Sequence, residues 1–327
     1  MAVFHTKDIS RKSFLVTGGA GFIGAHIVQY LLTHGAGKVR VLDNLATGSM
    51  NNVNLFIGYP QYEFMEGDIR DVETCIKACI GIDHVSHQAA LGSVPRSVKD
   101  PVTSNEVNVN GFVNMITAAK DAKVKTFVYA SSSAVYGDEP NLPKKEDRTG
   151  NLLSPYAVTK SANELYAAVF SSLYDMKVIG LRYFNVFGPR QDPEGPYAAV
   201  IPLFISGILK QTPVYINGDG EQTRDFTFVE NAVQANIKGM LTYNIAAFGQ
   251  VYNVAVGENF SVNFLYQAIS KALGKQHNPI YREARAGDIH DSLADISKAR
   301  RLLNYDPTMQ FLDGLKLTVQ YFVAVPE

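Results

Sequence analysis

The stretch LVTGGAGFIG, residues Leu15–Gly24, decides the fold of this chain. A short apolar run ends at Thr17, three glycines follow at three-residue spacing, and a helical pattern of apolar residues then begins. In a strand–turn–helix of this kind one glycine permits the tight turn, one lets the backbone approach a pyrophosphate, and one lets helix and strand pack closely. The free N–H groups and positive dipole end of the helix would hold the diphosphate. The stretch therefore predicts a dinucleotide site built on Gly18, Gly21 and Gly24.

An aspartate at the end of the next strand points to the cofactor. The predicted strand Val39–Leu42 is followed by Asp43, nineteen residues after Gly24, where a group that accepts from a ribose 2′-hydroxyl belongs. A carboxylate repels a 2′-phosphate, and Asn44–Leu45 offers no arginine to bind one. The pattern favours NAD over NADP; the alternative is a plain structural turn with a surface aspartate.

Strand and helix patterns alternate along the first half of the chain. Its short, apolar, non-alternating strands are those expected when helices cover both faces of a parallel sheet. The candidate strands are Phe14–Thr17, Val39–Leu42, Tyr62–Met65, His84–His87, Thr126–Ala130 and Lys177–Arg182. Helical patterns lie near residues 22–34, 71–80, 104–122 and 155–174. The expected fold class is α/β, with a Rossmann-type doubly wound parallel sheet.

The rhythm changes after Phe187, where glycines and prolines between residues 188 and 196 mark loops and shorter elements follow. We expect residues 1–186 to form an NAD-binding domain. Residues 187–327 would form a smaller α/β substrate-binding lobe, with some segments returning to the first domain. Such a lobe would close over the strand ends, where open α/β sheets bind ligands.

Composition excludes several classes of protein. The chain is 46% hydrophobic with a formal net charge of −1, which gives no electrostatic footprint for nucleic acid or an anionic membrane. Cys75 and Cys79, four apart on one predicted helix, are expected to be small buried residues rather than a disulfide, and no Cys/His cluster has metal-ligand spacing. The N-terminal segment lacks the apolar core of a signal peptide and no apolar run could span a bilayer, so a cytoplasmic location is expected.

A second informative pattern reads YAVTK, from Tyr156 to Lys160. Ser154 and Pro155 are typical of a helix start, and residues four apart share a helix face, so the two side chains can reach one site. A phenol is a poor base at neutral pH, but a nearby ammonium and an oxidised nicotinamide favour the phenolate. Ser131–Ser133 ends the preceding strand and could hydrogen-bond the same substrate oxygen. Without that cluster, a Tyr and a Lys at this spacing would be mostly a solvated helix face.

Together, the glycine fingerprint, the serine cluster and the Tyr156/Lys160 pair resemble the extended short-chain dehydrogenase/reductase family. Further matching motifs, in family order, are GDIR (67–70), QAA (88–90), LRYFNVFG (181–188), GDG (218–220), RDF (224–226) and RAGD (285–288). Within this family the chain is similar to nucleotide-sugar 4-epimerases. Three motifs resemble the UDP-N-acetylglucosamine 4-epimerases, a branch known from bacterial surface-polysaccharide pathways: LGSVPRS (91–97), SPYAVTK (154–160) and GLRYFNVFG (180–188).

The resemblance implies roles for the matching residues. The expected NAD-binding residues are Gly18, Gly21, Phe22, Ile23, Gly24, Asp43, Asn44, Gly48, Asp68 (near the adenine), Ile69, Gln88, Ala89, Tyr156 and Lys160. The sugar would meet Ser93, Ser132, Ser133, Tyr156 and Asn185, and the uridine diphosphate would meet Ala199, Val200, Tyr215, Arg224, Arg285 and Asp288. Arginines suit diphosphate because a guanidinium binds phosphate oxygens bidentately. The alternative for Arg224 is a surface ion pair with Asp225 or Glu221.

The implied reaction is reversible C4 epimerisation of a UDP-hexose through a transient 4-keto sugar, with NAD bound. The substrate pair that the resemblance favours is UDP-N-acetylglucosamine/UDP-N-acetylgalactosamine. Alternatives are UDP-glucose/UDP-galactose or UDP-uronate 4-epimerase, then a dehydratase or decarboxylase, then a non-catalytic NAD-binding regulator. Related dehydratases place an acidic pair where this chain has Ser133 and Ala134, which cannot eliminate water. Counting back from Tyr136 favours Ser132 as the catalytic hydroxyl, whereas counting serines favours Ser133.

Two further expectations concern substrate range and assembly. Seven positions beyond Arg285, Ser292 would line the pocket near the sugar C2 substituent, where a tyrosine would exclude an N-acetyl group; the alternative is a small loop residue. The helices near 104–122 and 155–174 carry apolar residues on more than one face, which indicates burial in the core or at a partner interface. These residues include Phe112, Met115, Leu165, Val169 and Phe170. Because related enzymes pair these two helices, a homodimer is expected.

Overall fold

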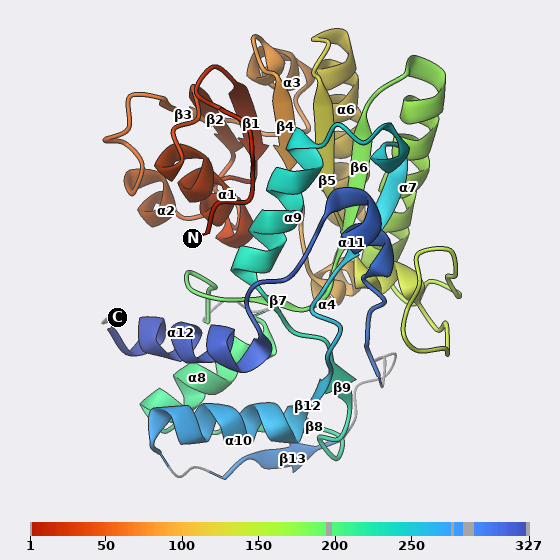
Figure 1. The fold of residues 1–327 in the computed structure, drawn as a ribbon. Coiled ribbons are helices and arrows are strands. Elements are labelled where there is room, and N and C mark those ends of the chain that lie inside the picture. Colours follow the sequence, from red (N-terminus) through yellow and green to blue (C-terminus); the bar gives the residue numbers. More distant parts are fainter. Residues whose placement is uncertain (1, 194–197, 276–277, 284–290, 325–327) are drawn as a thin grey trace.

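The computed structural model describes residues 2–193, 198–275, 278–283 and 291–324. At its centre lies a parallel sheet of seven strands in the order β11-β6-β5-β4-β1-β2-β3 (Figure 1). The strands are β1 (Ser13–Thr17), β2 (Lys38–Asp43), β3 (Tyr62–Glu66), β4 (His84–His87), β5 (Thr126–Ser132), β6 (Val178–Tyr183) and β11 (Gln250–Val254). The predicted doubly wound α/β fold is confirmed, and the six predicted strands correspond to β1–β6.

Helices cover both faces of this sheet. One layer holds α3, α6 and α7, and the other holds α1, α9 and α11 (Figure 1). The α-helices of the sheet domain are α1 (Phe22–Thr33), α2 (Met50–Asn54), α3 (Val72–Cys79), α4 (Val94–Lys99), α5 (Pro101–Asn105), α6 (Gly111–Asp121), α7 (Pro155–Tyr174), α9 (Val229–Leu241) and α11 (Ser297–Leu303). Short 3₁₀ turns occupy Ser133–Tyr136 and Ile245–Ala247.

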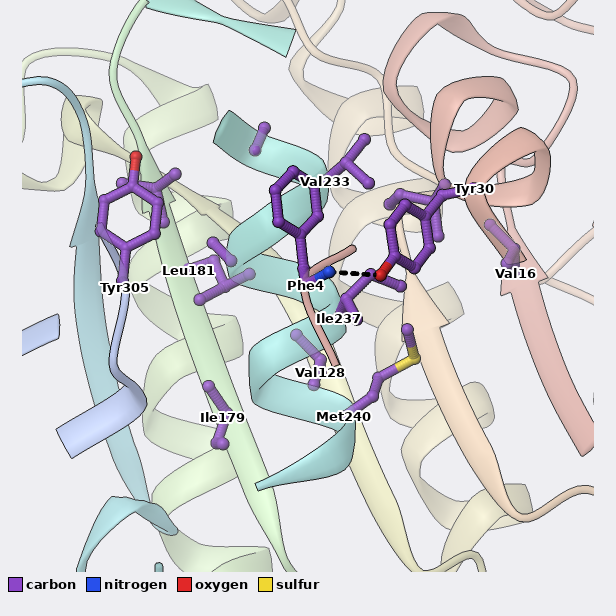
Figure 2. Close-up of a cluster of buried hydrophobic side chains, with 14 of the residues drawn as sticks. Phe4, Val16, Tyr30, Val128, Ile179, Leu181, Val233, Ile237, Met240 and Tyr305 are labelled. Carbon is purple, nitrogen blue, oxygen red and sulfur yellow. Dashed lines mark hydrogen bonds between the residues drawn. The ribbon is translucent and has the colours of Figure 1, made fainter. Parts of the chain in front are cut away.

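Side chains alternate between the two layers along each strand. In β1, Phe14 and Val16 belong to the cluster under α1 and α9, whereas Leu15 belongs to the cluster under α3 and α6. Figure 2 shows strand residues of the first cluster facing the side chains of α9. Beside them the N-terminal segment is held by Phe4, whose ring stacks on Tyr30 at 5.3 Å and whose N–H donates to the Tyr30 hydroxyl at 2.7 Å.

Two segments from the second half of the chain join the central sheet. Strand β11 pairs with β6, with Gln250 opposite Ile179 and Val254 opposite Tyr183, and α9 packs on β4, β5 and β6. Neither element was predicted individually, because the sequence assigns each only to a region of shorter elements after Phe187.

The predicted helix near residues 104–122 is confirmed, and it contains a π-helical turn that the sequence did not predict. The chain forms α5 (Pro101–Asn105), then a π-helical turn over Glu106–Asn110, then α6 (Gly111–Asp121). The wide turn coincides with buried polar bonds: the Asn108 amide Nδ2 donates to the Leu91 carbonyl at 3.2 Å, and the Asn163 amide Nδ2 donates to the Asn108 carbonyl at 2.7 Å. Hydrophobic periodicity does not register such bonds with distant residues.

A second lobe lies beyond the carboxyl ends of the strands, with its own apolar cluster (Figure 1). It contains α8 (Val200–Lys210), α10 (Val262–Leu273) and α12 (Phe311–Ala324). Three two-stranded sheets pair β7 (Val186–Phe187) with β10 (Thr227–Phe228), β9 (Thr223–Arg224) with β12 (Phe260–Ser261), and β8 (Tyr215–Asn217) with β13 (Ile280–Arg282). No helix in the described part of the chain is long and apolar enough to cross a bilayer.

Candidate functional site

The glycine-rich turn after β1 has the close contacts that its sequence predicts. Gly18 has φ +67°, and a Cβ there would lie 2.7 Å from the Ala89 backbone nitrogen. A Cβ on Gly24 would clash with the Gly18 carbonyl oxygen and lie 2.8 Å from both the Gly18 carbonyl carbon and the Gly19 Cα, so the first turn of α1 packs directly on the loop. Gly21 is different, because its Cβ would meet only the Gly18 carbonyl oxygen, at 3.2 Å. Gly18 and Gly24 therefore allow close backbone contacts within the protein, whereas Gly21 leaves space in front of the turn for a ligand to approach.

This turn fits a diphosphate. Gly21 is the N-cap of α1 and makes no side-chain cap, so the first N–H groups of the helix lack a capping side chain. Free N–H groups and the positive end of a helix dipole favour a phosphate. Phe22 and Ile23, in the first turn, are half-buried against the apolar cluster of the second lobe. The amino end of α1 thus lies where the two lobes meet.

Asp43 ends β2 beside the glycine turn. Its carboxylate accepts from the Ala20 N–H at 3.0 Å and the Leu45 N–H at 2.8 Å, while burial raises its pKa. Gly48 leaves space in front of it, since a Cβ there would lie 2.9 Å from Asp43 Oδ1. A carboxylate anchored in this way can accept from a ribose hydroxyl.

Asp68, expected near the adenine, follows β3, and the expected NAD-binding Asn44 follows β2 directly after Asp43. The Asn44 amide donates to Asp68 at 2.8 Å, and Arg70 pairs with the same carboxylate, which lowers the pKa of Asp68 to about 2. Ile69 is buried and packs so tightly against α6 that a Cβ on Gly111 would lie 2.6 Å from it. Asp68 thus remains ionised, held by the neighbouring guanidinium.

Gln88, after β4, is held by a buried polar network. Its amide nitrogen donates to Ser86 and to Asn236 of α9, each at 3.0 Å, and its oxygen accepts from the Tyr183 hydroxyl at 3.0 Å. Every polar atom of this side chain is therefore fixed in orientation. Asn236 lies on α9, about 150 residues after Gln88, so the sequence pattern around Gln88 could not predict this hydrogen bond.

Tyr156 and Lys160 lie together near the amino end of α7. The helix starts as predicted, with Ser154 accepting from the Ala157 N–H at 3.2 Å and proline in the first turn. Lys160 Nζ lies 5.9 Å from the centre of the Tyr156 ring and donates to the Ala130 carbonyl at 2.9 Å. Both side chains sit at the carboxyl edge of the sheet, beside the end of β5.

The two groups are tuned mainly by burial. Burial raises the pKa of Tyr156, and a hydrogen bond with Ser132 lowers it. Burial lowers the pKa of Lys160 to about 8, and Glu164 opposes that shift. The structure brings Ser132 to the phenol, whereas Ser133 begins the following 3₁₀ turn. A buried phenol needs added positive charge to ionise at neutral pH, and an oxidised nicotinamide carries that charge.

Sequence reasoning missed the group that supports this centre. Glu164 lies one helical turn beyond Lys160 and binds Arg182 through two hydrogen bonds, of 2.9 and 2.8 Å. The Ser131 hydroxyl donates to the same carboxylate at 2.5 Å. Glu164 thus ties α7 to Ser131 of β5 and Arg182 of β6, and its charge also acts on Lys160. The four-residue spacing from Lys160 was the available signal.

The expected substrate residues are spread over both lobes. Ser93 caps α4 by accepting from the Arg96 N–H, and Ala199 and Val200 stand at the amino end of α8. Tyr215 and Arg224 lie on β8 and β9, and the buried Ser292 donates its N–H to the Thr223 carbonyl at 3.2 Å, next to Arg224. The two remaining expected residues, Arg285 and Asp288, lie outside the described residues.

Asn185 and Asp225 join the lobes at the end of β6. Asn185 has φ +35° and its amide donates to the Asp225 carbonyl at 3.1 Å. The Asp225 carboxylate accepts from the backbone N–H groups of Val256, Gly257 and Ala294, while burial raises the pKa of this group to about 7. Asp225 is thus a buried residue whose carboxylate holds three backbone N–H groups, and it is not a surface residue.

Cys75 and Cys79 are both free and buried, as predicted. Burial raises the pKa of each thiol to about 12, which leaves them unreactive. Among the described residues no group of three or more His, Cys, Asp or Glu side chains is arranged to hold a metal ion.

Comparison with known proteins agrees with this geometry. Residues 14–255 match the NAD-dependent epimerase/dehydratase family. The UDP-glucose 4-epimerase of Mycolicibacterium smegmatis is 38% identical over 310 residues, covering 94% of this chain and 97% of that protein. A UDP-N-acetylglucosamine 4-epimerase from Methanobrevibacter ruminantium, solved with UDP-N-acetylmuramic acid, is 41% identical with a TM-score of 0.90, covering 96% of this chain and 98% of that one. The Thermus thermophilus UDP-glucose 4-epimerase, solved with NAD, is 36% identical with a TM-score of 0.85, covering 96% of this chain and all of that one.

The chain belongs to the NAD-dependent epimerase/dehydratase family and has the extended short-chain dehydrogenase/reductase fold. It is therefore an NAD-dependent enzyme. The glycine turn and Asp43 lie at the ends of its first two strands, and Tyr156 and Lys160 lie at the end of β5.

Proposed function

We propose that this enzyme interconverts UDP-N-acetylglucosamine and UDP-N-acetylgalactosamine by inverting C4 of the sugar. The observation that carries an epimerase is the grouping of half-buried Tyr156 and Ser132 with the buried Lys160 at the carboxyl ends of the sheet strands. The relatives described above include 4-epimerases of UDP-sugars, which supports a UDP-sugar substrate.

The glycine turn and Asp43 would hold NAD, which when bound supplies a hydride acceptor for C4 and returns the hydride to the opposite face. Tyr156 would take the proton of the sugar 4-hydroxyl, and Ser132 would hydrogen-bond the same oxygen. Lys160 would favour the phenolate and orient the cofactor. The product alcohol regains its proton from Tyr156, so the cycle needs no second substrate.

The second lobe would anchor the diphosphate while the sugar turns over. Arg224 and Arg285 would bind phosphate oxygens, Tyr215 would contact the uridine, and Asn185 and Ser93 would contact the sugar. The proposal also includes the other NAD-binding and UDP-sugar-binding residues that the family resemblance implies, each in the role given in the sequence analysis. Firm anchoring of UDP with a mobile hexose is the physical requirement for presenting both faces of C4.

The preference for the acetylated sugar rests on Ser292. This residue is buried, and its backbone is fixed to Thr223, next to the proposed phosphate-binding Arg224. A serine leaves space that a tyrosine ring would fill, and its hydroxyl can bond an amide. A pocket tuned by one substituent discriminates by about 1–3 kcal/mol, so the non-acetylated sugars would remain weaker substrates.

The experiment compares kcat/KM for UDP-N-acetylglucosamine and UDP-glucose, with products resolved by NMR, in wild type, Ser292→Tyr and Ser292→Ala. Ser292→Tyr should lose the acetylated activity and retain the non-acetylated one, while Ser292→Ala, which adds no bulk, should retain both. Unchanged acetylated activity in Ser292→Tyr would overturn the assignment of the gate. Release of a 4-keto-6-deoxy sugar, or of CO₂ from a uronate, would overturn the epimerase.

We also propose that the active form is a homodimer joined through α7. Phe112 and Met115, named above for an interface or core, are fully buried within the subunit. By contrast Leu165, Val169 and Leu173 are 68%, 53% and 67% exposed on one side of α7. A contiguous apolar face of this kind is typical of a protein interface, and a second copy would cover it by two-fold symmetry.

A further inference from the structure

Three residues assigned above to the UDP-sugar lie on separate segments of the chain. Asn185 follows β6, Arg224 ends β9, and Ser292 lies between β13 and α11. Residues so far apart in the sequence cannot fix one another's positions through the local backbone. A substrate that all three hold at once needs a further group that sets their arrangement.

Asp225 is bonded beside each of these residues. The Asn185 amide donates to the Asp225 carbonyl at 3.1 Å, and Arg224 directly precedes Asp225 in the chain. The carboxylate oxygen Oδ2 of Asp225 accepts from the Ala294 N–H at 3.2 Å, two residues beyond Ser292. The three segments that carry the proposed substrate residues therefore meet at Asp225.

Thr223, on the other side of Arg224, fastens two of the same segments. Its hydroxyl donates to Asp291 Oδ1 at 2.6 Å, and its carbonyl accepts from the Ser292 N–H at 3.2 Å. The strand that carries Arg224 is thus bonded to the segment of Ser292 both before and after the arginine. A shift of one segment would move the other.

The Asp225 carboxylate is fully buried and accepts from three backbone N–H groups. Besides Ala294, its partners are Val256 and Gly257, each at 3.1 Å, just after β11. Burial raises the pKa of Asp225 to about 7, so the ionised form is costly in this position. Hydrogen bonds to a charged acceptor are roughly twice as strong as neutral ones, so an ionised Asp225 holds its partners firmly.

We propose that Asp225 is the positioning residue of the UDP-sugar site: with the support of Thr223, it holds Asn185, Arg224 and the segment of Ser292 in one arrangement. The inference rests on the proposed function, which assigns those residues to the sugar and its diphosphate. Because Asp225 is itself fully buried, it acts through these neighbours and not by touching the substrate.

UDP is the probe, titrated calorimetrically at pH 8, where Asp225 is ionised, into NAD-saturated wild type, Asp225→Asn and Asp225→Ala. An asparagine offers one oxygen in place of two and can keep at most two of the three N–H partners, whereas alanine keeps none. The Kd for UDP should rise about threefold in Asp225→Asn and at least about tenfold in Asp225→Ala, with one UDP per chain throughout. The Kd for NAD should change less than about twofold, because the glycine turn and Asp43 would hold NAD on the first two strands.

Asn231→Ala is the matched control. Asn231 is also fully buried, and its side-chain oxygen accepts from the N–H groups of Thr308 and Met309 at 3.0 and 3.2 Å. Alanine there likewise leaves buried donors unpaired, but on segments that carry none of the three substrate residues. Asn231→Ala should lower the free energy of unfolding in urea while the Kd for UDP stays unchanged.

Thr223→Val is the second variant, because it nearly keeps the side-chain size and loses the hydroxyl that bonds Asp291 and Asn259. It should weaken UDP severalfold with Asp225 intact. An unchanged Kd for UDP in Asp225→Ala would overturn the inference. Equal losses of UDP and NAD affinity, or fewer UDP sites at an unchanged Kd, would also overturn it, since they mark a general structural loss.

Failure of the proposed function gives a different result. Wild-type protein that binds no UDP would overturn the UDP-sugar assignment and this inference with it, whereas wild-type binding that the variants retain overturns the inference alone. Should both Asp225 variants fail to fold, unchanged UDP affinity in Thr223→Val would overturn the inference.

Discussion

Replacing Gly24 by alanine tests the link between the glycine turn and the cofactor. In an ordinary helix interior this change stabilises by up to about 1 kcal/mol. Here the new Cβ would clash with the Gly18 carbonyl oxygen and lie 2.8 Å from the Gly18 carbonyl carbon and the Gly19 Cα, whereas carbon atoms pack at about 3.5–4.0 Å. Both partners are backbone, so α1 must move by roughly 0.7 Å or more away from the loop. Overpacking of this kind costs about 1–3 kcal/mol, and we expect a net loss of stability of that order.

Gly21→Ala is the matched control, because it adds the same methyl group three residues earlier. Its Cβ would meet only the Gly18 carbonyl oxygen at 3.2 Å, so stability should change by less than about 1 kcal/mol. NAD affinity should nevertheless fall at least tenfold, since the methyl occupies the approach to the diphosphate. Urea denaturation of cofactor-free protein measures the first quantity and NAD titration the second. Equal stability of Gly24→Ala and wild type, or full NAD affinity in Gly21→Ala, would refute the reasoning.

Three further outcomes are expected. Tyr156→Phe should lose at least about a hundredfold in kcat while NAD titration shows retained binding, because the general base alone is removed; near-normal turnover would place the proton transfer elsewhere. Burial lowers the pKa of His84 to about 4 and of His87 to about 3, below their unfolded value, so the unfolded chain takes up protons first. Stability present above pH 6.5 should therefore be lost on acidification from 6.5 toward 4 in urea titrations, and a flat profile would contradict this. Leu165→Glu/Leu173→Glu should give a monomeric mass by light scattering, and a wild-type protein that is itself monomeric would refute the dimer.

The local chemistry of the cofactor cradle could be predicted from the sequence because it is encoded by adjacent residues. A glycine at position 24 reports a close helix–loop contact whatever the rest of the chain does, and the apolar run before Thr17 defines the strand that leads to it. The Tyr156/Lys160 pair is local in the same sense, since four residues on one helix fix their relative position. Strands β1–β6 were predicted for the same reason, as short apolar runs between helical patterns.

What depends on distant partners could not be predicted in this way. Periodicity could not assign β11 to the sheet, because strand pairing with β6 is decided by contacts across some seventy residues. It also could not separate Phe112, which is buried inside the subunit, from Leu165, which is exposed, since both lie on apolar helix faces. The Glu164–Arg182 pair and the His84–Thr126 hydrogen bond exist only because the fold brings separate helices and strands together. Sequence determined the chemistry available at each strand end; tertiary packing decided which of those groups meet, which are buried, and which remain without a partner.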